Sequence, residues 1–200
     1  MATNKYVLAI LSLTSLFLMQ FTCKKLEIDC TQVKYNFQLP VKAYPNKDSI
    51  NIGDTLWLEI NEPITFKNTD SSLINYGGAE NLGSAVGFQL YNPVTKDWID
   101  AVNKFAFYLI KGTELKVTSL DIEYRFSEQN SMYVFKLGVV PKQKGLFRLV
   151  FSNSGNTFRK SDKCTKANFT INFKETNHNR HLVGYVGPDV LGGDLNFYVK

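Results

Sequence analysis

Histidine, cysteine and methionine are scarce in this sequence, and blocks of like charge are absent. The 200 residues include 2 histidines, 3 cysteines and 3 methionines. Lys and Arg outnumber Asp and Glu to give a net charge of +5, but they are scattered among the acids and never form a block of five or six. Neither a basic helix nor a nucleic-acid-binding motif accompanies this excess. We therefore expect no nucleic acid among the partners of this protein.

The motifs of the common enzyme classes are missing as well. The chain has no Gly-x-Ser-x-Gly elbow, no phosphate-binding loop and no dinucleotide fingerprint. Its two histidines, His178 and His181, lack the glutamate that a zinc protease carries directly after the first histidine. Their spacing alone allows a two-histidine metal site, and a solvated loop is the simpler interpretation. We expect a protein that is not an enzyme and has no catalytic residue, no metal and no cofactor.

The N-terminal segment is the most informative part of the chain. One charge, Lys5, precedes an apolar run from Val7 to Met19, which has the length of a secretory signal and is short for a membrane span of about 20 residues. Cys23 follows this segment, where a bacterial lipoprotein receives its lipid. The alternative is an uncleaved N-terminal membrane helix with an incidental cysteine. We expect residues 1–22 to be a lipoprotein signal peptide and Cys23 to anchor the chain to a membrane.

The cysteine count supports this assignment and predicts a disulfide. Three cysteines in an exported chain leave one without an intramolecular partner. If Cys23 carries the lipid, Cys30 and Cys164 remain as an even pair in an oxidising compartment. Closing a loop of this length stabilises a fold by about 4 to 5 kcal/mol in the chain-entropy model. Two buried free thiols are the alternative. We expect a Cys30–Cys164 bridge that ties the start of the first strand to the strand near Ala167, with residues 23–31 as a tether.

Strand signals dominate the chain from residue 32 onward, and no stretch shows sustained helical periodicity. In one late run, Phe147, Leu149 and Phe151 share one face while Arg148 lies on the other, as in a half-buried antiparallel strand. Asn92–Asp97 is typical of a hairpin loop. Nine runs rich in β-branched and aromatic residues are expected to be strands: 33–39, 55–60, 85–91, 105–110, 114–126, 132–140, 146–151, 167–173 and 195–199.

Two polar stretches, residues 62–84 and 175–193, interrupt these strands. The first is rich in Asn, Asp, Ser and Gly and has few strand-forming residues, and the second contains Asn177, Asn179, Pro188 and a Gly192-Gly193 pair. Long loops without secondary structure of their own are often functional or mobile, so a binding function would be sought there first. The whole pattern predicts an all-β protein with a single antiparallel β-sandwich over residues 32–200.

Short motifs in the chain resemble two groups of proteins. Gln20–Lys25 is similar to the relaxed lipoprotein boxes of Bacteroidota, in which a lysine follows the cysteine. Tyr35–Pro40 and Ile50–Trp57 together resemble the opening of small Bacteroidota lipoproteins that form domain families of unknown function. Lys144–Leu149 resembles the late strand of immunoglobulin-like domains, with Phe147 in the place of the usual tyrosine. The resemblance implies an immunoglobulin-like sandwich on an outer-membrane lipoprotein that faces the periplasm or the cell surface. It assigns no function to any residue of this chain.

That group of lipoproteins also carries glycans on Ser or Thr in short motifs that begin with Asp. Asp48-Ser49-Ile50 and Asp54-Thr55-Leu56 fit the pattern, although strand and turn formation explains both equally well.

The two tryptophans are the remaining candidates for contact with a ligand. Trp57 lies on the strand face opposite Leu56 and Leu58, and Trp98 borders the expected hairpin loop beside Asp97. Rings flanked by carboxylates and amides can stack on sugars, whereas packing in the core or at a sheet edge is the alternative for each. We expect a lipid-anchored cell-envelope protein that acts as a non-catalytic binding or structural module with a glycan or protein partner. A glycan-binding accessory lipoprotein and a pilus or surface-layer subunit are the two specific forms of this hypothesis.

Overall fold

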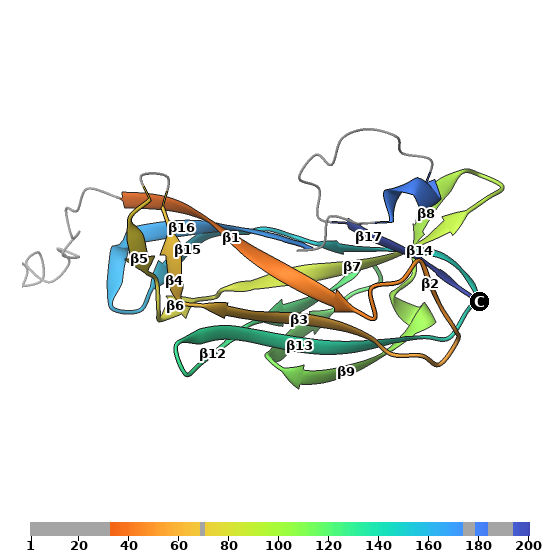
Figure 1. The fold of residues 1–200 in the computed structure, drawn as a ribbon, viewed down its shortest axis with the longest axis horizontal. Coiled ribbons are helices and arrows are strands. Elements are labelled where there is room, and N and C mark those ends of the chain that lie inside the picture. Colours follow the sequence, from red (N-terminus) through yellow and green to blue (C-terminus); the bar gives the residue numbers. More distant parts are fainter. Residues whose placement is uncertain (1–32, 69–70, 174–178, 184–193) are drawn as a thin grey trace, which may run out of the picture. The chain divides into compact units, whose positions relative to one another are not determined.

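Strands make up most of the chain that the computed structural model describes, which is residues 33–68, 71–173, 179–183 and 194–200 (Figure 1). The only helical elements in these ranges are two 3₁₀ turns, η1 (Val102–Lys104) and η2 (Arg180–Val183). The predicted all-β fold is therefore confirmed. None of the described helical turns is long and apolar enough to cross a membrane.

The strands form two large sheets and one small hairpin. The first sheet has eight strands in the order β12-β13-β3-β1-β16-β15-β6, with β9 also paired to β13. Its strands are β1 (Val33–Tyr44), β3 (Leu56–Pro63), β6 (Ala79–Glu80), β9 (Phe105–Lys111), β12 (Ser127–Gln129), β13 (Met132–Pro141), β15 (Ser154–Arg159) and β16 (Asp162–Phe173).

The second sheet has seven strands in the order β10-β11-β7-β14-β17-β2, with β8 also paired to β7. Its strands are β2 (Ser49–Ile50), β7 (Gly83–Asn92), β8 (Asp97–Asp100), β10 (Thr113–Val117), β11 (Asp121–Arg125), β14 (Gly145–Phe151) and β17 (Asp194–Val199). The small hairpin joins β4 (Thr65–Lys67) to β5 (Leu73–Asn75). Most pairings are antiparallel, and two are parallel: β1 with β16, and β17 with β2.

Aromatic side chains join the two large sheets into a sandwich. Phe135 of the first sheet contacts Tyr124 and Phe151 of the second, with ring centres 5.3 and 6.3 Å apart. Phe151 in turn meets Phe173 of β16 at 5.5 Å. All four rings are buried, and aromatic pairs of this kind add about 0.5 to 1.5 kcal/mol beyond the burial of their area. The predicted alternation in β14 is confirmed, because Phe147, Leu149 and Phe151 are buried and Arg148 is not.

The segment 62–84 is not the unstructured loop that the sequence predicts. It contains β4, β5 and β6, and it places Phe66 and Tyr76 over one end of the core. There the two rings meet Phe37 and Phe169, with ring centres 4.6 to 5.8 Å apart. The apolar residues of this segment are scattered among polar ones and give little strand signal, yet the buried ones dock the segment on the core.

Two strand boundaries also differ from the prediction. The run 114–126 is a hairpin, β10 and β11, because the Thr118 hydroxyl accepts the backbone N–H of Leu120 and of Asp121 and so forms a turn. In addition, β1 continues through Pro40 to Tyr44. Proline is tolerated there because β1 pairs only with β16 at Pro40 and its pairing with β3 begins at Lys42.

Candidate functional site

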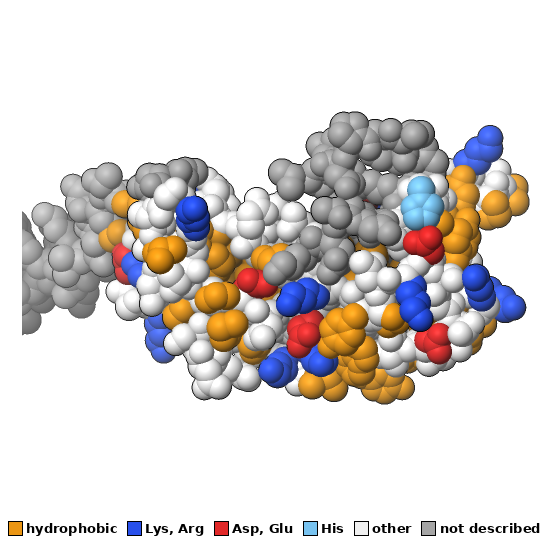
Figure 2. All heavy atoms as spheres, in the orientation of Figure 1, with side chains coloured by type: hydrophobic (Ala, Val, Ile, Leu, Met, Phe, Trp, Pro, Cys, Tyr) orange, Lys and Arg blue, Asp and Glu red, His pale blue; other side chains and the backbone are white. Residues whose placement is uncertain are grey.

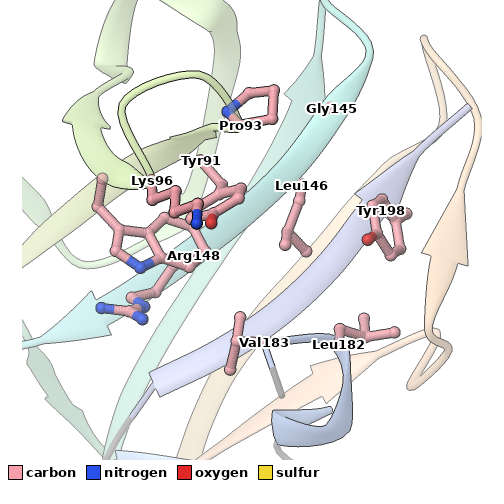
Figure 3. Close-up of a pocket in the computed structure, with 10 residues that line it drawn as sticks. Tyr91, Pro93, Lys96, Gly145, Leu146, Arg148, Leu182, Val183 and Tyr198 are labelled. Atoms are coloured by element: carbon pink, nitrogen blue, oxygen red, sulfur yellow. The ribbon is translucent and has the colours of Figure 1, made fainter. Parts of the chain in front are cut away.

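A pocket of about 820 Å³ lies on the outer face of the second sheet, at the end where β7, β8, β14 and β17 meet η2 (Figure 3). Tyr91, Trp98 and Tyr198 give it aromatic walls, and Leu146 with Leu182 gives it aliphatic ones. A volume of this size is that of sites for small organic ligands. The pocket is therefore the strongest candidate for a functional site in the part of the chain that the structure describes.

The β7–β8 hairpin places two of these aromatic side chains. The strands are joined by Pro93–Lys96, which confirms the predicted loop, and the backbone N–H of Val94 is held by the side chain of Asn92 at 3.0 Å. Tyr91 stands directly opposite Trp98 in the ladder, so both side chains lie on one face. Their ring centres are 5.4 Å apart at an interplanar angle of 59°. Both rings are half-buried and form one wall of the pocket.

The neighbouring strand β14 supplies the floor and a cation. Gly145 begins this strand at φ +148°, and a Cβ atom there would lie 2.5 Å from Leu90, so no other residue fits without a shift. Because Phe147 turns into the core, Leu146 and Arg148 must turn to the opposite face, where the pocket lies. This explains the Lys-Gly-Leu-Phe-Arg-Leu motif as the local structure that positions Arg148.

Arg148 is held by two contacts. Its guanidinium carbon lies 3.9 Å from the ring centre of Trp98, and its Nε lies 3.6 Å from a carboxylate oxygen of Asp194. Burial lowers the pKa of the guanidinium, and the nearby Asp194 carboxylate acts in the opposite direction. The guanidinium stays protonated at neutral pH, because arginine is too strong a base to lose its proton there. Trp98 and Arg148 therefore form one aromatic and cationic unit.

The short turn η2 closes the other side of the pocket. Asn179, which is fully buried with φ +51°, donates its side-chain N–H to the backbone carbonyl of Asn196 at 2.7 Å. His181 lies 3.1 Å from a carboxylate oxygen of Asp48. These contacts fix η2 against β17 and the β2 region, so that Leu182 faces Tyr198 across the opening.

Trp57, the second predicted ligand contact, belongs to a different sheet and does not join Trp98. It lies on the outer face of β3, half-buried, with Tyr44 and Gly138 as its direct neighbours in the ladder. A Cβ atom on Gly138 would lie 2.9 Å from the indole ring, so the ring packs over this glycine. Lys136 places its ammonium 5.3 Å from the ring centre. Trp57 lines neither the pocket beside Trp98 nor the one beside Tyr124.

The predicted cysteine sites lie largely outside the described residues. This holds for Cys23 and Cys30, so lipidation and the bridge to Cys164 stay predictions. Val33 stands opposite Thr165 in the parallel β1–β16 ladder, which brings the start of β1 beside Cys164, as such a bridge requires. His178 also lies outside the described residues, and among those described no group of three His, Cys, Asp or Glu side chains could hold a metal ion.

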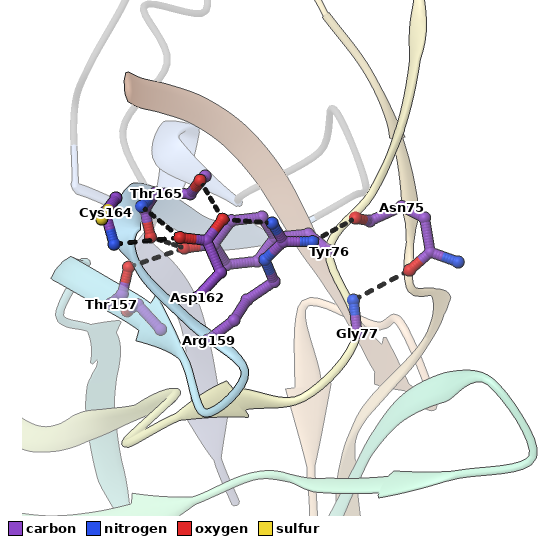
Figure 4. A network of polar contacts seen from close by, with 8 residues as sticks. All are labelled: Asn75, Tyr76, Gly77, Thr157, Arg159, Asp162, Cys164 and Thr165. Atoms are coloured by element: carbon purple, nitrogen blue, oxygen red, sulfur yellow. Dashed lines mark hydrogen bonds and ion pairs between the residues drawn. The ribbon is translucent and has the colours of Figure 1, made fainter. Parts of the chain in front are cut away.

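A polar network surrounds Cys164 at the β15–β16 turn (Figure 4). Asp162 accepts hydrogen bonds from the Thr165 hydroxyl, from Arg159 at 2.7 Å and from the backbone N–H of Cys164 at 3.0 Å. The bonds from Thr165 and Arg159 lower the pKa of Asp162 from 3.8 to about 2. Tyr76 places its hydroxyl 2.8 Å from the carbonyl of Thr157, and burial raises the pKa of this phenol to about 12. These contacts order the β15–β16 turn.

Exposed apolar side chains gather along one edge of the sandwich. Figure 2 shows hydrophobic side chains along the lower rim near β9, further groups of them at the left and at the upper right, and charges of both signs between these groups. Within residues 108–120, five large apolar side chains are at least half exposed: Tyr108, Ile110, Leu115, Val117 and Leu120. Every residue of β10 is exposed, and β10 is the last strand of its sheet. This edge is a second candidate surface for interaction.

Comparisons with known proteins do not identify a family. No protein-family model matches the sequence. No curated protein matches it either. Among solved structures, the CupB6 tip adhesin from Pseudomonas aeruginosa aligns over 73% of this chain and 42% of its own length, with 13% identity and a TM-score of 0.16. This chain thus spans less than half of that structure, and a TM-score so low carries no argument about fold or function.

Proposed function

We propose that this protein is a non-catalytic binding module of the bacterial cell envelope and that the Trp98 pocket binds a saccharide. The observation that carries the proposal is the Tyr91–Trp98 pair, two half-buried rings 5.4 Å apart that wall an open pocket. Trp98 also contacts the Arg148 guanidinium, so apolar ring faces and N–H donors lie within one small site.

This combination suits a sugar better than a purely apolar ligand. A sugar ring has C–H faces that pack on aromatic rings and hydroxyl groups around its edge that need hydrogen-bond partners. Tyr91 and Tyr198 each offer a phenol, Trp98 offers an indole N–H, and Arg148 offers a fork of donors. The site carries no arrangement of a nucleophile with a base among the described residues that line it, which supports a binding role.

A glycan microarray tests the proposal. The mature protein from Cys23 onward, with that residue changed to Ser, should give a defined set of saccharide signals. Trp98→Ala should abolish these signals because it removes the stacking surface. Trp57→Ala is the matched control, since Trp57 lies on the other sheet and should leave the signals unchanged. Loss with Trp57→Ala and retention with Trp98→Ala would move the site to the first sheet.

The envelope location rests on the signal segment and Cys23. An anchor of this type would hold the sandwich at the outer membrane, with residues 23–31 as the tether. Mass spectrometry of the N-terminal peptide should find diacylglycerol on Cys23. Cys23→Ser should shift the protein from the membrane fraction to the soluble one. A wild-type protein without acyl groups that fractionates as soluble would refute the anchor.

A structural role in assembly is the second candidate, and the exposed β10 edge favours it. Two copies could pair through antiparallel β10 strands related by a two-fold axis at Leu115. In that arrangement Glu114 of each chain faces Lys116 of the other. The bulge between these two residues in the β10–β11 ladder weakens such pairing, which is why we rank this role second. Sedimentation should then show dimers that Lys116→Glu disrupts and that the double exchange Glu114→Lys with Lys116→Glu restores. Monomers at all concentrations would refute this role.

A further inference from the structure

Arg148 is a cation whose hydrogen-bonding capacity the described structure uses only in part. Its Nε is buried, has no hydrogen bond and faces Asp194 at 3.6 Å, which is longer than a hydrogen bond. No described residue accepts a hydrogen bond from its two terminal nitrogens. The side chain is 25% exposed, so water reaches only part of it. A partly buried arginine with unused N–H donors can bind a hydrogen-bond acceptor of a ligand.

The charged side chains in the described lining of the pocket have one sign. Of the described residues that line the pocket, the charged ones are Lys96 and Arg148, both positive. Lys96 is exposed at the tip of the β7–β8 hairpin, where φ +59° fixes its backbone. The carboxylate that pairs with Arg148 is that of Asp194, and its oxygen lies 3.6 Å from Nε. Toward a ligand in the opening, the described lining therefore presents two cations and no carboxylate.

The position of Arg148 on Trp98 sets the direction of its donors. A guanidinium that covers a ring face is kept there by the cation–π attraction and keeps its N–H groups at its edge. The planar fork matches a carboxylate or a sulfate better than it matches a single hydroxyl. Lys96, in the loop of the same hairpin, adds a second positive charge to the lining of the pocket.

We propose that the saccharide bound in this pocket is acidic, with its oxyanion held by Arg148 and Lys96 while its ring lies against the Tyr91–Trp98 wall. This inference rests on the proposed saccharide-binding function and names its substrate class. The oxyanion is the carboxylate of a uronic acid or the sulfate of a sulfated sugar. The two have the same chemistry toward a guanidinium.

Calorimetric titration with matched ligands tests the inference. The probes are an oligogalacturonate, its fully methyl-esterified form and a sulfated galactan oligosaccharide of similar length. The protein is the Cys23→Ser mature chain, compared with its Arg148→Met, Arg148→Lys, Lys96→Met and Lys34→Met variants. Lys34→Met is the matched control, because Lys34 is exposed on β1 of the other sheet and its change removes the same unit of charge.

At least one acidic probe should bind about tenfold or more tightly than the neutral ester, as one charge-assisted hydrogen-bonded contact provides. Arg148→Met should abolish this preference, Arg148→Lys should restore only part of it, and Lys34→Met should leave it intact. The stronger of the two acidic probes identifies the oxyanion.

Three outcomes would overturn the inference. Equal affinity for the ester and the acids would show a neutral saccharide site, which leaves the proposed function in place. An equal loss with Lys34→Met would show non-specific attraction to the net charge. Tighter binding of adenosine monophosphate than of any saccharide, together with a blank microarray, would refute both the inference and the proposed function.

Discussion

The guanidinium carbon of Arg148 lies 3.9 Å from the ring centre of Trp98, although the two residues belong to strands that do not pair with each other. Both strands, β14 and β8, flank β7, so the Arg148 side chain crosses β7 to reach the indole ring. The contact links the hairpin wall of the pocket to its floor. It is the structural reason why the site combines stacking with positive charge.

Removing this cation should loosen Trp98. In a Trp57→Phe background Trp98 is the only tryptophan, because the chain has two. Arg148→Met should then increase the quenching of Trp98 fluorescence by acrylamide and lower the free energy of unfolding by about 1 kcal/mol. Lys136→Met in the same background is the control, since Lys136 contacts Trp57 and not Trp98. Unchanged quenching in the Arg148 variant would show that the contact does not hold the ring.

Phe169 should be among the most important residues for stability. It is fully buried at the centre of an aromatic cluster and contacts four rings within 6.2 Å, those of Phe37, Phe66, Tyr76 and Tyr133. Phe169→Ala should lower the free energy of unfolding in urea by about 3 to 5 kcal/mol through lost burial and a cavity. Tyr108→Ala, at a site that is 55% exposed, should cost well under about 1 kcal/mol. A similar loss of unfolding free energy in the Phe169 and Tyr108 variants would contradict the described core.

The hydrogen bonds to Asp162 should make the stability of the fold depend on pH in the acid range. The pKa of Asp162 is about 2 in the folded chain and has an ordinary value of 3.8, so the folded state favours the ionised carboxylate. The resulting stabilisation is fully present above about pH 4 and is lost as the pH falls through about 2. Asp162→Asn should therefore be less stable than wild type at pH 6, and urea unfolding at decreasing pH should show the difference shrinking. A difference that stays constant down to pH 2 would rule out this role.

Gly138 should be required because the Trp57 ring lies over it. A Cβ atom there would lie 2.9 Å from the indole and 3.2 Å from the Thr55 side chain. Gly138→Val should destabilise the fold by about 1 to 3 kcal/mol through overpacking. Removal of the ring in the double variant Gly138→Val with Trp57→Ala should recover part of that loss in thermal unfolding. Gly155→Val is the control, because a Cβ atom there meets its nearest neighbour at 3.9 Å.

The sequence predicts the strands of this protein better than it predicts their partners. Runs such as β13 and β14 are recognisable because burial on one or both faces imposes a local pattern. The parallel pairing of β1 with β16 joins segments more than 100 residues apart and has no local signal. The strands β4 and β5 have three residues each and also lack a local signal, so the sequence does not predict them.

In the candidate site, too, local features are predictable from the sequence, whereas the arrangement of the strands is not. Trp98 and the loop beside it were identifiable from the sequence, because a ring next to a polar turn is a local feature. The alternation in the sequence predicts only that Arg148 lies on the polar face of a strand, and no local pattern marks Tyr91 or Tyr198 as part of a site. Their convergence depends on strand order, which places β8, β7, β14 and β17 side by side. Spacing along the chain contains no information about that order.

The most direct test of the central claim is the fluorescence of Trp98 during titration with the saccharide that the microarray identifies. In the Trp57→Phe mature protein, ligand should change the Trp98 emission in a saturable way and should protect the indole from acrylamide. The affinity from this curve should equal the calorimetric one. Calorimetric binding that leaves the emission and the quenching of Trp98 unchanged would show that the ligand binds elsewhere, and the pocket would lose its proposed role.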